Sequence, residues 1–131
     1  MKYCIGLLLI CFCLVSVAQN KDSRYFEMRT YHCNENKRPD LIKRFQDHTL
    51  ALFEKHGMKN EMYWTPLGTD RANQLIYVVS HESEEAAKKS WAAFRADPDW
   101  IKARDASEAD GKIVEKVESV MMKAADFFGK K

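Results

Sequence analysis

The stretch that decides the fold is residues 73–80, which read NQLIYVVS. In a β-strand, successive side chains point to opposite faces of the sheet. Both faces of this stretch are apolar, with Leu75, Tyr77 and Val79 on one and Ile76 and Val78 on the other. A strand that is apolar on both faces is buried on both faces. We therefore expect residues 73–80 to lie in the middle of a sheet with cover on each side.

Hydrophobic spacing and turn residues predict the other elements around this strand. We expect strands over residues 25–33, 58–65 and 113–122 and helices over residues 39–56 and 83–110, the second helix being broken at Asp97-Pro98-Asp99. In the second strand, Met58, Met62 and Trp64 are expected on one face. This order of strand, helix, strand, strand, helix and strand is typical of an α+β, ferredoxin-like βαββαβ fold with a four-stranded antiparallel sheet.

The first strand gives a second reason to expect cover on both sides of the sheet. Its two faces carry Phe26, Met28 and Thr30 on one side and Tyr25, Glu27, Arg29 and Tyr31 on the other. Two helices cover only one face, and we expect the face with the tyrosines to need another cover. A whole exposed apolar sheet face promotes aggregation. We therefore expect a homodimer in which two sheets pack face to face across a two-fold axis.

Composition limits the class of protein and its partners. The chain has 131 residues, of which 46% are hydrophobic and 31% charged. These values are typical of one globular domain and exclude a long disordered or low-complexity chain. The formal net charge is only +2, so we expect no nucleic-acid partner. Residues 73–80 also lack the aromatic and glycine motif of ferredoxin-like RNA-binding domains.

Residues 1–18 are typical of a cleaved secretory signal. Lys2 precedes an uncharged apolar run, and Ser16-Val17-Ala18 places small residues before Gln19. The alternative is a transmembrane anchor, but a bilayer core needs about 20 apolar residues and this run is shorter. We expect cleavage after Ala18, a mature domain over residues 19–131, and a secreted or periplasmic protein without stable membrane insertion.

Reactive groups are few in the expected mature domain. Cys33 would remain as its sole cysteine, so we expect no internal disulfide. It is either a reactive or intermolecular thiol or a small core residue, and we favour the core residue. The histidines show no metal-binding spacing, and no glycine-rich phosphate loop or GxSxG motif occurs. We therefore expect neither a metal site nor a cofactor.

Five pieces of the sequence resemble the NIPSNAP family in order and spacing. They are Tyr25–Tyr31 (YFEMRTY), Lys55-His56-Gly57, Trp64, Asn73-Gln74 before a hydrophobic strand, and Asp97–Trp100 (DPDW). The resemblance covers essentially the whole chain after residue 18. It implies a dimeric α+β barrel with a small cavity in the barrel or between sheet and helices, and it implies no settled reaction. The turn at residues 32–37 departs from the family because it has no glycine, so a cavity mouth at this turn would differ.

Aromatic and polar side chains that could bind a small molecule recur along the expected elements. The candidate ligand-binding residues are Arg29, Tyr31, His56, Trp64, Asn73, Tyr77 and Trp100. Arg29 can hold an anionic group, or it can pair with Glu27 on the same strand face at the dimer interface, which we favour. His56 is either a titratable group at a cavity rim or a favourable charge at a helix end, and we favour the helix end.

Three of these candidates come from neighbouring strands. Asn73 could donate a hydrogen bond to a ligand oxygen while Trp64 and Tyr77 stack on the ligand. Asn73 could equally be a turn residue that starts its strand. We hypothesise first a dimeric binding protein for a small organic molecule. The alternatives are a cofactor-independent monooxygenase, isomerase or haem-modifying enzyme, suggested by the fold resemblance alone, and a ligand-free interaction module.

Overall fold

The structure is a computed structural model in which residues 24–127 are described. Its strands pair in one four-stranded antiparallel sheet with the order β2-β3-β1-β4. The elements are β1 (Tyr25–Cys33), α1 (Arg38–Arg44), η1 (Phe45–Thr49), α2 (Leu50–Lys55), β2 (Lys59–Trp64), η2 (Thr69–Arg71), β3 (Gln74–His81), α3 (Glu84–Ala96), α4 (Pro98–Ser107) and β4 (Val114–Met122). The predicted ferredoxin-like order and the central position of residues 73–80 are confirmed, and β1 is the other central strand. The expected signal at residues 1–18 lies outside the described residues.

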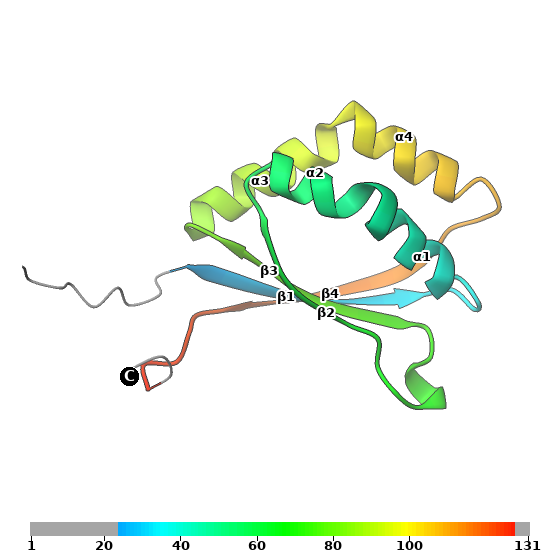
Figure 1. Cartoon of the computed structure of the whole chain (residues 1–131), viewed down its shortest axis with the longest axis horizontal. Helices are drawn as coiled ribbons and strands as arrows, with labels where there is room; N and C mark the ends of the chain where they lie inside the picture. The colour runs from blue at the N-terminus through cyan, green and yellow to red at the C-terminus, as the bar shows by residue number, and fades with distance from the viewer. Residues whose placement is uncertain (1–23, 128–131) are drawn as a thin grey trace, which may run out of the picture.

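All four α-helices lie on one side of the sheet, and in the part of the chain shown in colour the other side carries only the short 3-10 helix η2, in the loop beyond the end of β2 (Figure 1). The face that they cover is the face of Glu27 and Tyr31. Glu27 lies beneath α3, whose Trp91 donates a hydrogen bond to it, and Tyr31 packs against Phe45 of η1. Our expectation that a partner covers this face is therefore wrong. The chain's own helix layer covers this face and supplies one hydrogen bond to Glu27, and the open face is the one with Phe26 and Met28.

The open face carries apolar side chains on all four strands, together with polar ones such as Thr30, Ser80 and Glu118. Register places the following side chains on it: Phe26, Met28, Met62, Trp64, Ile76, Val78, Val120 and Met122. We call this set the open face. Met62, Trp64 and Val120 are about half exposed, at 52%, 47% and 49%. The prediction that β3 is apolar on both faces is confirmed, and its helix side is fully covered, since Tyr77 and Val79 are both 0% exposed.

The prediction that Met58 shares a face with Met62 and Trp64 is wrong, because β2 contains a β-bulge. The register of β2 against β3 shifts between Asn60 and Met62, so the chain inserts one residue there. An extra residue reverses the alternation of side chains. Met58 therefore points into the core, where it is 1% exposed, while Met62 lies on the open face. Trp64 shares the open face with Met62 as predicted, but Met58 does not.

The expected helix over residues 39–56 forms, with a π-helical turn, η1, in its middle. The buried side chains of the first part are Leu41, Arg44 and Phe45, and those of the second part are Thr49, Leu52 and Phe53. The second set repeats the first after eight residues, whereas two α-helical turns repeat after about seven. A π turn takes up the additional residue and keeps both sets on one face. Gly57 then ends the helix with a positive φ of 78°.

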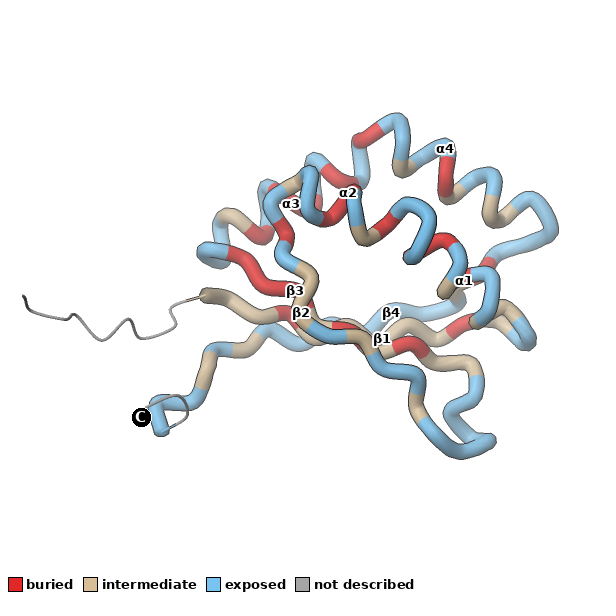
Figure 2. Tube along the Cα trace, viewed as in Figure 1, coloured by how far each residue is buried: buried red, intermediate tan, exposed pale blue. Residues whose placement is uncertain are grey.

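β4 differs from the central strands because almost all of it is exposed on both faces (Figure 2). It pairs with β1 along its length and forms one edge of the sheet. Val117 and Met121 point to the helix side and are 39% and 44% exposed. Cys33, opposite Val114, is buried in the hydrophobic core, and burial raises the pKa of its thiol. This position supports the core-residue interpretation of Cys33 over the reactive one.

Candidate functional site

A buried carboxylate organises the polar groups between the sheet and α3. Glu27 is 4% exposed. Its Oε1 accepts hydrogen bonds from Arg29 Nη1 at 2.7 Å and Ser119 Oγ at 2.6 Å. Its Oε2 accepts from Trp91 Nε1 at 2.5 Å and lies 3.4 Å from His81 Nε2. We call these five residues the Glu27 cluster; it joins β1, β3, α3 and β4.

Electrostatics keep both Glu27 and Arg29 charged. Burial alone would raise the pKa of Glu27, but interactions with His81, Ser119, Trp91 and Arg29 lower it to about 2. Burial would conversely lower the pKa of Arg29, and the nearby tyrosines together with Glu27 raise it above its usual range. Glu27 and Arg29 are therefore a carboxylate and a guanidinium at neutral pH.

The guanidinium of Arg29 uses few of its donors inside the protein. Its ζ-carbon lies 4.3 Å from the centroid of the Trp91 ring and 5.6 Å from that of Tyr31, so aromatic rings flank it. Among the described residues, Glu27 is its only hydrogen-bond acceptor. Nε is buried and has no partner there. An arginine has five N–H donors, so Arg29 makes fewer hydrogen bonds inside the protein than it could.

A row of aromatic side chains continues from Arg29 toward the β2 edge. Tyr77 donates a hydrogen bond from its hydroxyl to that of Tyr31 at 3.1 Å, and their ring centroids are 5.3 Å apart. Tyr63 of β2 stacks on Tyr77 with centroids 5.2 Å apart. Its hydroxyl donates to Asn60 Oδ1 at 2.6 Å. Burial raises the pKa of both Tyr63 and Tyr77, so both remain neutral phenols at physiological pH.

An apolar pocket of about 300 Å³ lies where this row reaches η1 and β2. It is lined by Ile42, Phe45, Gln46, Leu50, Tyr63, Trp64, Thr65 and Leu75. Small-molecule sites have volumes of about 300–1,000 Å³ and combine apolar walls with a few polar groups. Gln46 and Thr65 supply such groups here. We call this cavity the β2 pocket.

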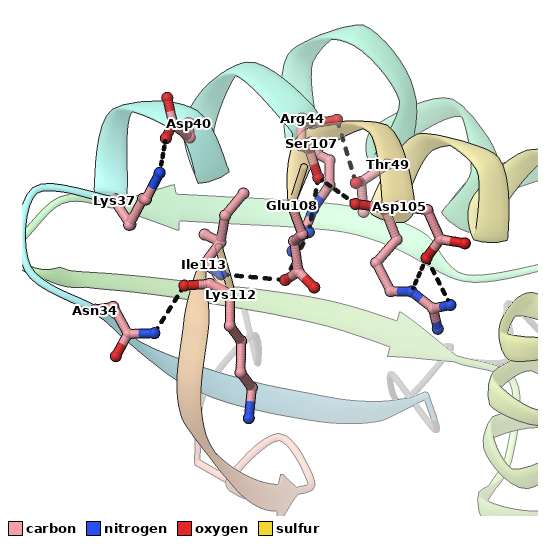
Figure 3. Close-up of polar contacts among 11 residues, drawn as sticks. Asn34, Lys37, Asp40, Arg44, Thr49, Asp105, Ser107, Glu108, Lys112 and Ile113 are labelled. Carbon is pink, nitrogen blue, oxygen red and sulfur yellow. Dashed lines mark hydrogen bonds and ion pairs between the residues drawn. The ribbon is translucent and has the colours of Figure 1, made fainter. Parts of the chain in front are cut away.

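A second pocket, of about 290 Å³, lies between α1, η1 and α4 and is charged. Arg44 lies at its base, 5% exposed, and donates to Ser107 Oγ at 3.1 Å and Glu108 Oε1 at 3.4 Å (Figure 3). Glu108 also accepts from the backbone N–H of Ile113 at 3.2 Å, which ties the start of β4 to the helices (Figure 3). The charged lining residues are Lys37, Lys43, Arg44, Asp40, Asp47 and Asp110. Because basic and acidic groups are balanced, this pocket favours no class of ligand.

Two predicted candidates hold the helix layer together. His56 Nε2 lies 2.7 Å from Asp97 Oδ2, and Lys55 Nζ lies 2.8 Å from the same oxygen. Hydrogen bonds from Lys55, His56 and the backbone of Asp99 hold the pKa of Asp97 well below its usual range. Trp100 packs on Phe94 with ring centroids 4.5 Å apart. These contacts place both His56 and Trp100 in the packing between helices rather than on the β2 pocket.

The expected group of Trp64, Asn73 and Tyr77 is divided by the sheet. Trp64 pairs with Ile76 on the open face, whereas Tyr77 faces the helices. Asn73 precedes β3, and its backbone oxygen accepts a hydrogen bond from the N–H of Cys33 at 2.8 Å. Trp64 also lines the β2 pocket. Arg29, Tyr31 and Tyr77 do come together, on the helix side of the sheet.

Sequence reasoning missed three partners of Glu27 and the polar lining of the β2 pocket. The indole N–H of Trp91 reaches a carboxylate on a distant strand, and nothing in a sequence reveals such a contact. His81 and Ser119 come from strands far apart in the chain. A signal did exist for the pocket, since the eight-residue spacing of buried positions predicts an irregular turn beside Gln46. Among residues 24–127, no group of histidine, cysteine or acidic side chains could hold a metal ion.

These features define a class of α+β protein with a ferredoxin-like sheet, one helix layer and an open sheet face. The chain belongs to the NIPSNAP family, whose sequence model matches residues 26–128. No helix in the described part is long and apolar enough to cross a bilayer. Among curated proteins, none matches the sequence.

Solved structures with this fold come from the same family and beyond it. A NIPSNAP family protein of unknown function from Agrobacterium tumefaciens is 22% identical, with a TM-score of 0.67 over 79% of this chain and 90% of that one. An uncharacterised NIPSNAP domain protein from Burkholderia xenovorans is 25% identical, with a TM-score of 0.65 over 79% and 96% of the two chains. SnoaB, a cofactor-independent oxygenase from Streptomyces nogalater, is 12% identical, with a TM-score of 0.55 over 82% and 99%. The likeness to SnoaB shows a shared fold alone.

Proposed function

We propose that this NIPSNAP protein is an exported homodimer that binds a small, largely apolar organic molecule. The observation that carries the binding proposal is the β2 pocket, whose volume and lining suit such a ligand. Export is supported by the pattern of residues 1–18. The dimer is supported by the open face, which no element within residues 24–127 covers.

A neutral apolar dye, Nile red, tests the β2 pocket. Ile42→Trp places a larger side chain in the pocket wall, and Ala92→Trp makes the same kind of change on the exposed side of α3. We expect saturable dye fluorescence with one site per subunit, weakened at least about tenfold by Ile42→Trp and unchanged by Ala92→Trp. Equal binding by all three proteins would contradict a ligand site in the β2 pocket.

A charged substitution on the open face tests the dimer. Val78 lies on β3 between Met28 of β1 and Met62 of β2. Val78→Glu places a charge in the middle of the proposed interface, and Ala92→Glu is the control on the helix layer. We expect sedimentation at micromolar concentration to give a dimer for the wild type and for Ala92→Glu, and a folded monomer for Val78→Glu. A monomeric wild type would remove this part of the proposal.

An enzyme of the cofactor-independent oxygenase type is the second candidate. One observation favours it beyond the fold that SnoaB shares: Arg29, with unused N–H donors, lies beside the Trp91 and Tyr31 rings. Such donors stabilise negative charge that develops on a bound oxygen atom. Oxygen uptake with phenolic substrates tests this candidate, and titration with haem, followed at the Soret band, tests the haem-modifying alternative. No oxygen uptake and no Soret shift would exclude both.

A further inference from the structure

The helix side of β4 joins an apolar surface to an arginine with unused donors. Val117, Ser119 and Met121 lie opposite Tyr31, Arg29 and Glu27 in the register of β4 with β1, so all of them point to the same face. The helices do not bury this part of the sheet, because Val117 and Met121 are 39% and 44% exposed. Arg29 therefore lies at the border between the covered and uncovered parts of the sheet, with 19% of its side chain exposed.

Arg29 is held in place before any ligand binds. Glu27 fixes Nη1, and the Trp91 ring covers one side of the guanidinium at 4.3 Å. Nε is buried without a partner, and no described residue accepts a hydrogen bond from Nη2. A buried N–H without an acceptor destabilises the protein unless a bound group supplies one. The Nε and Nη2 edge of a guanidinium presents two parallel donors that match the two oxygens of a carboxylate.

We propose that Arg29 and the helix side of β4 form a recognition site for an organic carboxylate. The carboxylate accepts hydrogen bonds from the unused donors of Arg29, and the apolar part of the ligand lies on Val117 and Met121. Ser119, directly opposite Arg29, borders the site while its hydroxyl remains on Glu27. This site is separate from the β2 pocket, which lies at the opposite edge of the sheet.

Charge favours a monocarboxylate over a phosphate monoester. Glu27 offsets one positive charge next to the site, so the nearest charged groups, Glu27 and Arg29, together carry no net charge. A single carboxylate gains bidentate hydrogen bonds there at a moderate desolvation cost, whereas a doubly charged phosphate loses more hydration without a net positive charge to offset the loss. The exposed apolar side chains on β4 favour an acid with an aromatic or aliphatic body over acetate.

The side-chain Nε–Hε resonance of Arg29 reports the contact directly in NMR, and its assignment comes from its absence in Arg29→Lys. The probes are 4-phenylbutyrate, its neutral amide, acetate and inorganic phosphate. We expect 4-phenylbutyrate to shift this resonance to saturation and to bind at least about tenfold more tightly than the amide, the effect of one charge-assisted bidentate contact. Acetate and phosphate are expected to bind more weakly than 4-phenylbutyrate.

Substitution at Met121 keeps the test independent of the Glu27 cluster. Met121→Glu places a negative charge beside the proposed carboxylate, and Met121→Gln is the neutral control. We expect Met121→Glu to weaken 4-phenylbutyrate binding about fivefold relative to Met121→Gln. Equal binding of acid and amide, no shift of the Arg29 resonance in the folded protein, or equal affinity of the two Met121 variants would each overturn the proposal. The β2 pocket variant Ile42→Trp should leave this binding unchanged, so the two sites are tested separately.

Discussion

At the scale of single residues, Glu27 shows how a charge is kept inside this fold. A buried carboxylate is tolerated only when hydrogen bonds replace the water that it has lost. Arg29, Trp91 and Ser119 donate those bonds from three different elements. The stability of the sheet and the position of α3 therefore both depend on one side chain of β1.

Replacing Glu27 by glutamine tests this dependence. Glu27→Gln removes the negative charge that balances Arg29. It also replaces one accepting carboxylate oxygen by an N–H₂ group, which cannot accept the hydrogen bonds that point at it. We expect a loss of about 3 kcal/mol in the free energy of unfolding, the usual cost of breaking a buried ion pair. Urea denaturation measures it, with Glu115→Gln on the exposed part of β4 as control. A change in Glu27→Gln no larger than in the control would show that the Glu27 cluster adds nothing to stability.

The lowered pKa of Glu27 also predicts a dependence of stability on acid pH. Its pKa is about 2 in the folded state against an ordinary value of 4.5, so the unfolded chain takes up a proton first. Stability from this group is complete well above pH 4.5 and is lost as the pH falls from 4.5 to 2, by about 3 kcal/mol in total. Urea titrations from pH 7 to pH 2 should therefore show a steeper loss in the wild type than in Glu27→Gln. Parallel curves would contradict the lowered pKa.

At the scale of elements, η1 accommodates one residue more than two regular α-helical turns would contain, and so keeps the buried side chains before and after it on one face. Leu41, Phe45 and their neighbours would lose alignment with Thr49 and Phe53 if the whole segment were α-helical, because eight residues turn the helix about 80° past two full turns. The π turn removes this mismatch at the cost of irregular backbone bonding. The irregular backbone lies at the wall of the β2 pocket, where Phe45 and Gln46 line the cavity.

Deleting one exposed residue from η1 should therefore be tolerated. Removal of His48 restores a seven-residue repeat of the buried positions, and we expect a regular α-helix with a free energy of unfolding within about 1 kcal/mol of the wild type. Inserting an alanine after Asp47 makes the repeat nine residues and should cost several times more. Thermal and urea unfolding of the two variants measure the difference. An equal loss of unfolding free energy in both variants would contradict the interpretation that the π turn accommodates one additional residue.

Prediction from the sequence succeeded where alternation is regular and failed where one residue is added. Residues 25–33 form the expected strand, and the expected helix over residues 83–110 begins at Ser83, whose side chain accepts a hydrogen bond from the N–H of Ala86 at 3.1 Å. The predicted face of Met58 was wrong because β2 contains a bulge. Local sequence does not reveal where the register of a strand shifts. The face that the helices cover was also assigned wrongly, since that choice depends on Trp91 reaching Glu27 across the fold. The β2 pocket is likewise a product of packing between η1 and β2.

At the scale of the whole molecule, the open face sets how the protein exists in solution. Apolar residues of all four strands lie on it, and no described element covers them. Burying such a face against a second copy stabilises both subunits. Single exposed apolar residues are ordinary, but a group of them that extends across four strands is typical of an association surface.

A dimer formed through the open face predicts that unfolding depends on protein concentration. If folding and association are coupled, dilution favours the unfolded chain by mass action. We expect the urea midpoint of the wild type to rise between 1 µM and 100 µM, and that of Val78→Glu to stay constant. Circular dichroism at several concentrations measures both. A wild-type midpoint that does not move with concentration would contradict coupled dimerisation.

The exposure of β4 has a consequence for motion within the native state. This strand is held along its length by backbone hydrogen bonds to β1, while its own side chains bury little surface. A strand that is held by backbone hydrogen bonds but buries few side chains opens locally at a lower free energy than the core does. Amide hydrogens of β4 should therefore exchange with deuterated solvent sooner than those bonding β1 to β3, and an acid bound at Arg29 would slow them.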